Sequence, residues 1–158
     1  ATDKMTVWAG VRKSSDAAVG MVTELSSVFT NPGSFAMRAP KTLGLANYDF
    51  VSGGTASVAV TPPSSYAAPI TNVLTGIGDI SGDIVALRVN SAVAATATSD
   101  QGTGNFGNYP LYIGARAGTS LFFNGNLFGL VVRGAASTAD QITSTEQWLA
   151  PKTGVVLP

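Results

Sequence analysis

The chain has 158 residues, and its nine basic and nine acidic side chains balance to a net charge of zero. A single ordinary domain fits this length. The sequence contains no cysteine and no histidine, which excludes disulfides, thiolate metal sites and catalytic triads built on histidine. The lack of a basic excess argues against nucleic-acid binding, and no apolar run is long enough to predict a membrane span.

The first sixty residues alternate between apolar and polar side chains over short stretches, which is the period typical of strands. In residues 5–15 one face carries Val7, Ala9 and Val11, and the other carries Thr6, Trp8, Gly10 and Arg12. The turn residues Asn31-Pro32-Gly33 follow the second expected strand. Together the further strands expected here cover residues 20–27, residues 34–40 and the two halves of residues 47–63.

The second half continues the same pattern. We expect strands in residues 72–82, 84–90 and 92–99, with a tight turn at Asn90-Ser91. A long polar loop covers residues 100–110, and a further strand is centred on Ile113. Asn124-Gly125 tolerates the positive φ angles of a type I′ turn. It therefore predicts an antiparallel hairpin between residues 120–123 and 126–134.

One short helix is expected over residues 138–150. Ser137 is the predicted N-cap, with Asp140 three residues later in the capping-box position. Pro151 is expected to end the helix, and the β-branched residues at 143–145 could divide it in two. Ten to twelve strands with one C-terminal helix predict an all-β, two-sheet antiparallel jelly-roll sandwich, formed by residues 1–158 as a single domain.

Three segments carry a resemblance to a known family: residues 3–13, residues 82–95 (GDIVALRVNSAVAA) and residues 109–155, which open with YPLYIG and close with KTGV. They resemble a concanavalin A-like, or laminin G-like, jelly-roll domain of the type found in bacteriophage structural proteins. The resemblance implies a non-enzymatic virion protein of the tail or capsid, assembled in the host cytoplasm and acting in particle structure or host attachment. Its implied partners are other virion proteins, further copies of itself in a homo-oligomer, and cell-surface glycans.

Two other functions stay open, because this fold carries many activities. One is a carbohydrate-binding module or lectin domain of a bacterial secreted protein. The other is a glycan hydrolase, but the hydrolases of this fold use closely spaced carboxylates on one strand. Glu24 and Glu146 are far apart in the sequence, and the nearest acidic couple is Asp79 and Asp83. No catalytic residue is therefore predicted.

Glycan binding requires aromatic side chains and planar polar groups. The candidates lie in or just after the long polar loop and are Asp100, Asn105, Asn108, Tyr109, Tyr112 and Arg116. The alternative is that the asparagines form turns and the tyrosines cover the edge of the sandwich. The acidic residues Asp79 and Asp83 are weak candidates for calcium, and here too the alternative is a role in turns.

Two further groups of residues allow two interpretations each. Arg12, Glu24 and Arg38 fall on three consecutive strands, and they would form a cross-strand polar ladder if those strands were neighbours. They could form a binding face or an ordinary solvated face. The second group comprises Phe122, Phe123, Phe128 and Trp148. It predicts either an interface with another subunit or a helix that packs over the hairpin through Trp148.

Overall fold

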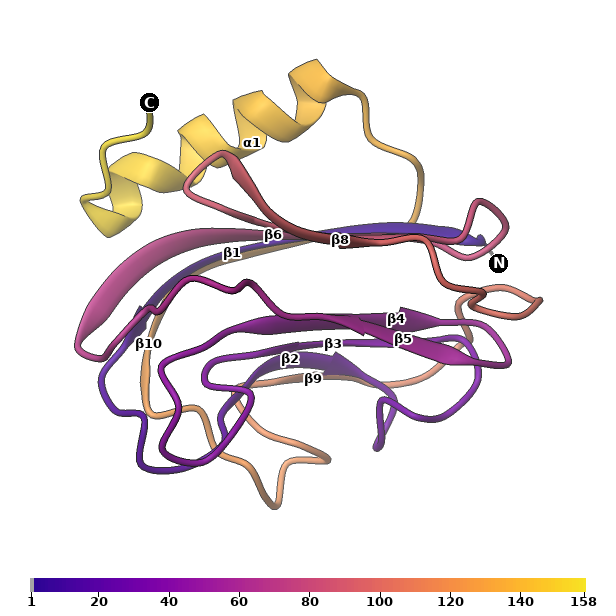
Figure 1. Ribbon diagram of the computed structural model, residues 1–158, viewed down its shortest axis with the longest axis horizontal. Helices are drawn as coiled ribbons and strands as arrows, with labels where there is room; N and C mark the ends of the chain where they lie inside the picture. The colour runs from indigo at the N-terminus through magenta and orange to yellow at the C-terminus, as the bar shows by residue number, and fades with distance from the viewer. Residues whose placement is uncertain (1) are drawn as a thin grey trace.

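Two five-stranded antiparallel sheets pack face to face in the computed structural model, which describes residues 2–158 (Figure 1). Sheet A has the strand order β10-β1-β6-β7-β8. Its strands are β1 (Lys4–Lys13), β6 (Ile70–Asp79), β7 (Ile84–Val89), β8 (Ala92–Ala97) and β10 (Gly125–Arg133). Sheet B has the order β5-β4-β3-β2-β9. Its strands are β2 (Met21–Leu25), β3 (Ser34–Arg38), β4 (Asp49–Gly53), β5 (Ser57–Val60) and β9 (Leu111–Ile113).

The main core lies between the sheets and is built from the alternate residues of each strand. Val7, Ala9 and Val11 of β1 face Phe35 and Met37 of sheet B across it, and all five are fully buried. Because successive side chains in a strand point to opposite faces, the residues between them lie on the outer faces. The predicted all-β sandwich with one C-terminal helix is confirmed.

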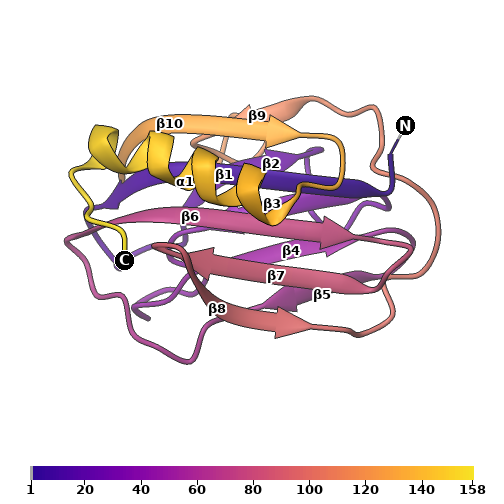
Figure 2. The ribbon, with the colours of Figure 1, turned by 90° about the horizontal axis from the view of Figure 1, so that it is seen from above.

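The helix α1 (Ala139–Thr153) covers the outer face of sheet A over β10, β1 and β6 (Figure 2). Leu149 and Ala150 pack there on Trp8 and Val73 and form a second, smaller core. The helix begins one residue later than predicted, because Thr138 and Gln141 form the capping box in place of Ser137 and Asp140. It runs unbroken through residues 143–145.

The predicted end of the helix at Pro151 is wrong. Pro151 lies inside the last turn, and the helix continues to Thr153, where it is capped by Gly154 in the left-handed conformation with φ 74°. Glycine is the usual residue at this position because it has no Cβ to clash. A helix of this length is too short and too polar to cross a membrane, and α1 is the one helix among residues 2–158.

The hairpin predicted at Asn124-Gly125 is also wrong. Residues 121–122 continue the edge of sheet B, where Met21 donates to the carbonyl of Leu121 and forms an isolated bridge with Phe122. The chain then crosses to sheet A, where β10 pairs with β1. Gly125 is required here for another reason: a Cβ would lie 2.0 Å from the carbonyl oxygen of Arg12.

The tight turn predicted at Asn90-Ser91 is confirmed. It joins β7 to β8, and both residues have positive φ, 49° and 68°. These are the angles of the primed turns that match the twist of paired strands. Serine accepts here a conformation that glycine adopts more easily.

Candidate functional site

The outer face of sheet B, which points away from sheet A, carries a cluster of charged and aromatic side chains. Its centre is apolar and consists of Met21, Ala36 and Val51, packed against Phe29 and Leu121. Phe29 comes from the connection between β2 and β3, and Leu121 comes from the segment between β9 and β10. These two segments fold over the sheet, and Figure 1 shows residues 114–124 on this side.

Two arginines pack on the Phe29 ring on this face. The guanidinium carbon of Arg38 lies 4.5 Å from the ring centre, and that of Arg116 lies 4.9 Å from it. Arg38 follows the buried Met37 on β3, so strand alternation places it outward. Arg116 follows β9 in a turn closed by hydrogen bonds between Arg116 and Ser120. The arrangement places two planar cations against one aromatic ring.

Each arginine is held by a buried carboxylate. Arg38 binds Asp49 of the neighbouring strand β4 in a two-pronged pair, with Nε donating to Oδ1 at 2.9 Å. Arg116 Nε lies 3.3 Å from both oxygens of Glu24. Burial raises the pKa of Asp49, and the hydrogen bonds from Arg38 oppose that effect. The carboxylates therefore orient the guanidinium groups and keep their charge next to Phe29.

The guanidinium groups keep hydrogen-bonding capacity. The Arg116 Nη2 atom is buried and has no hydrogen-bond acceptor, although it lies 3.2 Å from Glu24 Oε1 outside hydrogen-bonding geometry. The side chains of Arg38 and Arg116 are 13% and 23% exposed, so one edge of each reaches the surface. Tyr112 lies beside them on β9, opposite Glu24 and partly exposed. A ligand could thus meet cationic donors and aromatic rings at one place.

The predicted site residues divide between two places. Tyr112 and Arg116 belong to the outer face of sheet B. Asp100, Asn105, Asn108 and Tyr109 lie in the connection between β8 and β9, which crosses from sheet A to sheet B at one end of the sandwich. The structure therefore does not gather all six into one site.

The loop residues take part in turns and loop contacts. The Asp100 carboxylate accepts a hydrogen bond from the backbone of Gly102, as in an Asx turn. Tyr109 donates its hydroxyl to the carbonyl of Pro32 at 3.1 Å and remains 38% exposed. Asn105 and Asn108 are exposed, and no hydrogen bond of their side chains to the rest of residues 2–158 is present.

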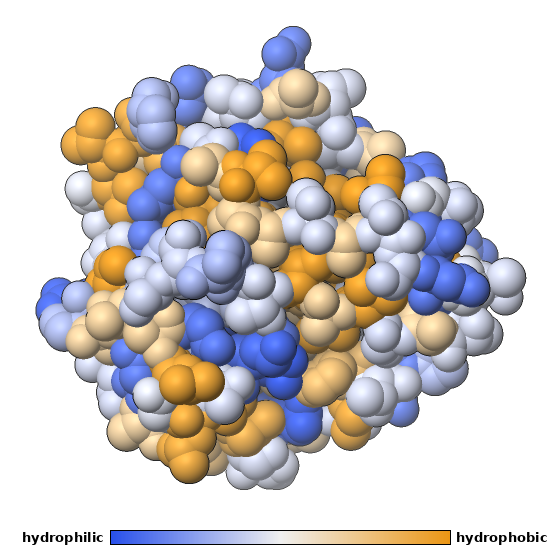
Figure 3. All heavy atoms as spheres, in the orientation of Figure 1, coloured by the Kyte–Doolittle hydropathy of each residue, from blue (hydrophilic) through white to orange (hydrophobic). Residues whose placement is uncertain are grey.

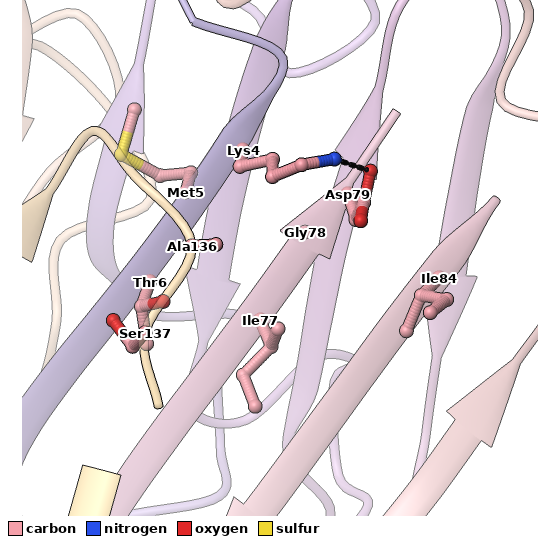
Figure 4. Close-up of a pocket in the computed structure, with 9 residues that line it drawn as sticks. All are labelled: Lys4, Met5, Thr6, Ile77, Gly78, Asp79, Ile84, Ala136 and Ser137. Carbon is pink, nitrogen blue, oxygen red and sulfur yellow. Dashed lines mark hydrogen bonds and ion pairs between the residues drawn. The ribbon is translucent and has the colours of Figure 1, made fainter. Parts of the chain in front are cut away.

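The two calcium candidates, Asp79 and Asp83, bind different partners within the protein. Asp79 lines a small cavity of about 150 Å³ on the outer face of sheet A, where its carboxylate binds the Lys4 ammonium at 2.6 Å (Figure 4). This hydrogen bond is the main cause of the raised pKa of Lys4. Asp83 accepts from the backbone of Gln101. Within residues 2–158, no three acidic side chains gather as a metal site would require.

The ladder expected from Arg12, Glu24 and Arg38 is wrong in part. Arg12 lies on β1 in sheet A, whereas Glu24 and Arg38 lie on neighbouring strands of sheet B. Glu24 and Arg38 do share the outer face of that sheet. After β1 the chain crosses from sheet A to sheet B, where it forms β2 and β3. The alternation of side chains within a strand does not show to which sheet that strand belongs. Phe29 and Asp49 complete the cluster, and the register of the β3–β4 hairpin would have indicated Asp49 as the partner of Arg38.

The two glutamates do not form a catalytic pair. Glu24 lies on the outer face of sheet B, and Glu146 lies under α1 on the outer face of sheet A. The Glu146 carboxylate accepts hydrogen bonds at 2.8 Å from Arg88 Nε and from the Thr75 hydroxyl. A retaining glycosidase needs its carboxyl groups about 5 Å apart. Both sheets of the sandwich lie between Glu24 and Glu146.

The apolar group near the C-terminus is only partly covered. Phe123 packs against the main core, while its neighbour Phe122 is 62% exposed. Phe128 and Trp148 are 40% and 53% exposed. The helix therefore packs through Leu149 and Ala150, and Trp148 lies at its margin with the Lys152 ammonium 4.3 Å from the ring centre.

Comparisons with known proteins found similarity to solved structures. No family model matches the sequence, and no curated protein matches it either. Among solved structures, the Ruminococcus gnavus IT-sialidase CBM40 bound to α2,3-sialyllactose superposes with a TM-score of 0.69 at 14% identity. That match covers 92% of this chain and 83% of the other. The chain has a concanavalin A-like β-sandwich fold.

Two further solved structures have the same fold. A native heptameric SAP-like pentraxin from Limulus polyphemus has a TM-score of 0.67 at 12% identity, covering 92% of this chain and 70% of the other. A putative carbohydrate-binding protein from Bacteroides ovatus has a TM-score of 0.66 at 17% identity, covering 89% of this chain and 40% of the other. Identities this low establish the fold alone.

Proposed function

We propose that the protein is a non-catalytic module that binds glycans on the outer face of sheet B. The observation that carries the proposal is the pair of partly exposed arginines that pack on the Phe29 ring, each held by a buried carboxylate. The likeness of the fold to the Ruminococcus gnavus carbohydrate-binding module supports it.

The chemistry of the face suits a sugar. Planar guanidinium groups donate paired hydrogen bonds to hydroxyl or carboxylate oxygens, and the partly exposed Tyr112 offers apolar surface to the ring carbons. Arg38 and Arg116 are already oriented by Asp49 and Glu24, so little side-chain entropy is lost on binding. A glycan that carries a carboxylate would satisfy the cationic donors best.

The test is binding of a glycan array, followed by calorimetry with the strongest glycan. Arg116→Lys keeps the positive charge beside Glu24 but removes the planar fork, and we expect it to weaken binding about tenfold to a hundredfold. Tyr112→Ala should also weaken binding, because it removes an aromatic surface.

Two control variants separate this face from other surfaces. Arg12→Lys changes an exposed arginine on sheet A and should leave binding unchanged. Tyr109→Ala tests the loop of residues 100–110 and should also have little effect. If Tyr109→Ala abolishes binding and Arg116→Lys does not, the site is the loop and the proposal for the outer face of sheet B is wrong.

A place in a bacteriophage particle stays a prediction from the sequence resemblance. It is compatible with glycan binding, because a host-attachment domain and a secreted module would use the same kind of face. A virion role would be tested by detecting the chain in purified particles, whereas the glycan array tests the binding face in either setting.

A further inference from the structure

A shallow groove lies between the helix α1 and the strand β10. It is lined by Val131 of β10 and by Ser144, Thr145 and Trp148 of α1, and its volume is about 270 Å³. We call it the α1–β10 groove. Since α1 covers the outer face of sheet A, both sheets separate this groove from the outer face of sheet B (Figure 1). The groove is therefore a second surface, distinct from the one proposed above to bind glycans.

The indole ring of Trp148 forms one wall of the groove and is held in position. The helix lies close to β10 at Gly129, where a Cβ would lie 2.7 Å from a methyl carbon of Leu149 and 3.9 Å from the Trp148 ring. The Lys152 ammonium, one helical turn later, lies 4.3 Å from the ring centre. Trp148 is nevertheless 53% exposed. A ligand would thus meet an aromatic surface that is already oriented, which lowers the entropy lost on binding.

Two hydroxyl groups stand next to this ring. Ser144 and Thr145 come one helical turn before Trp148, and helical side chains lean toward the N-terminus, so the indole leans over them. Both hydroxyls donate to the backbone carbonyl of Gln141, at 3.3 and 2.8 Å. Because a hydroxyl oxygen also accepts hydrogen bonds, these side chains present acceptors to the groove.

These features restrict the chemistry of the ligand. None of the four lining residues is charged, so an ionic ligand would meet no opposite charge among them. A purely aliphatic ligand would cover the two hydroxyl oxygens without giving them a hydrogen bond, which is unfavourable. The ligand that fits is neutral, carries hydrogen-bond donors and has an apolar face. A pyranose ring has these three properties, since C–H groups form one face and hydroxyls surround the ring.

The opposite side of the molecule provides a comparison. Figure 3 views that side, where hydrophobic and hydrophilic atoms are interspersed. The edge strand of sheet A there is β8, which consists of alanine, valine and threonine residues. Val93 is 63% exposed, but β8 carries no aromatic ring beside it. Exposed apolar residues are thus common to both sides, whereas an exposed indole next to hydroxyl acceptors distinguishes the α1–β10 groove.

We propose that the α1–β10 groove binds one neutral hexopyranose residue of a glycan. The apolar face of the sugar lies against Trp148, and its hydroxyls donate to Ser144 and Thr145. The groove has the volume of about nine water molecules at about 30 Å³ each, which is room for one sugar ring. The proposal does not depend on the site on sheet B, which suits a carboxylate. With both sites, one chain would bind glycans on two opposite faces and gain avidity for a dense glycan surface.

The experiment follows the indole N–H resonances of the ¹⁵N-labelled protein by NMR. The chain has two tryptophans, and a Trp148→Phe protein assigns their resonances. The probes are methyl β-galactopyranoside and methyl β-glucopyranoside, each titrated to about 100 mM, because one sugar ring with few contacts should bind with a Kd of about 1–10 mM. The Trp148 resonance should shift saturably with at least one probe, and that of the buried Trp8 should not.

Variants test the assigned contacts. Ser144→Ala combined with Thr145→Val keeps the indole and should weaken binding about tenfold, measured on the same resonance. Trp148→Ala should abolish binding, measured by saturation transfer to the sugar protons, and the double variant replaces it if it does not fold. Phe122→Ala removes an exposed ring outside the groove, and Arg116→Lys changes the site on sheet B. Both should leave the Trp148 shift unchanged.

Two outcomes would overturn the proposal. One is the absence of a saturable Trp148 shift with both probes. The other is an equal shift with 1-butanol, which would show that the groove takes apolar molecules without regard to the hydroxyls of a sugar. A saturable Trp148 shift in a protein that binds no glycan through Arg116 would contradict the site on sheet B and still support the groove.

Discussion

At the scale of single residues, the two buried glutamates each join segments that are distant in the sequence. Glu24 accepts a hydrogen bond from the Phe29 backbone at 2.8 Å and pairs with Arg116. Glu146 pairs with Arg88 and so attaches α1 to β7. A buried carboxylate without such partners would be strongly unfavourable. Both carboxylates therefore fix the position of segments outside the main core.

The first prediction concerns Glu146→Gln. The change removes the charge that Arg88 and Thr75 bind, so the free energy of unfolding should fall by about 2 kcal/mol. Denaturation by urea at neutral pH measures it. Asp140→Asn, an exposed change in the first turn of the same helix, is the control and should cost less than about 1 kcal/mol.

The same variant predicts a dependence on pH. Burial alone would raise the pKa of Glu146, but hydrogen bonds from Arg88 and Thr75 outweigh it, and the pKa lies below its usual value. The stabilisation is therefore complete above the unfolded pKa of about 4.3 and is lost as pH falls through the lower folded value. The difference between wild type and Glu146→Gln should shrink below about pH 4. A difference that stays constant down to low pH would contradict the assignment.

At the scale of elements, turn signals proved less reliable than strand periodicity. Asn124-Gly125 is the stronger hairpin signal in the sequence, yet the hairpin forms at Asn90-Ser91. Gly125 is needed because the backbone of Arg12 approaches it, a contact between residues far apart in the chain. A dipeptide cannot distinguish a glycine that adopts positive φ from one that makes room for a neighbour. Structure alone separates the two causes.

The second prediction concerns the start of α1. Thr138 accepts a hydrogen bond from the Gln141 backbone, and the Gln141 side chain accepts one from the Thr138 backbone. Thr138→Ala should lower the free energy of unfolding by about 1 kcal/mol. The predicted cap, Ser137, is the control, since its buried hydroxyl has no hydrogen-bond partner. Ser137→Ala should be neutral or slightly stabilising, and a larger loss from Ser137→Ala than from Thr138→Ala would reverse the assignment of the cap.

At the scale of the whole molecule, the sequence predicted the two-sheet sandwich but not the membership of each sheet. Period-two alternation identified β1, β3 and β7 because burial of one face is a local property of a strand. Strand β1 pairs with β6 and β10, which come much later in the chain, and nothing local specifies those partners. For the same reason the sequence could not decide whether Arg12 neighbours Glu24, and it named Arg116 without Phe29.

The last prediction concerns the second core, between α1 and sheet A. Trp8 is 1% exposed beneath the helix and Trp148 is 53% exposed at its margin. In a Trp148→Phe protein, the fluorescence of Trp8 should lie at short wavelength and resist quenching by acrylamide. In a Trp8→Phe protein, the remaining Trp148 should be quenched readily.

Adding Leu149→Ala to the Trp148→Phe protein tests what protects Trp8. Leu149 is fully buried against β1 and β10, and its removal leaves a cavity that should cost about 2–4 kcal/mol of stability. Quenching of Trp8 should then increase while the circular dichroism of the strands is unchanged, because the main core lies on the other face of sheet A. If Trp8 stays protected although the stability falls, its burial comes from the sheet itself, and the helix is not the element that closes this core.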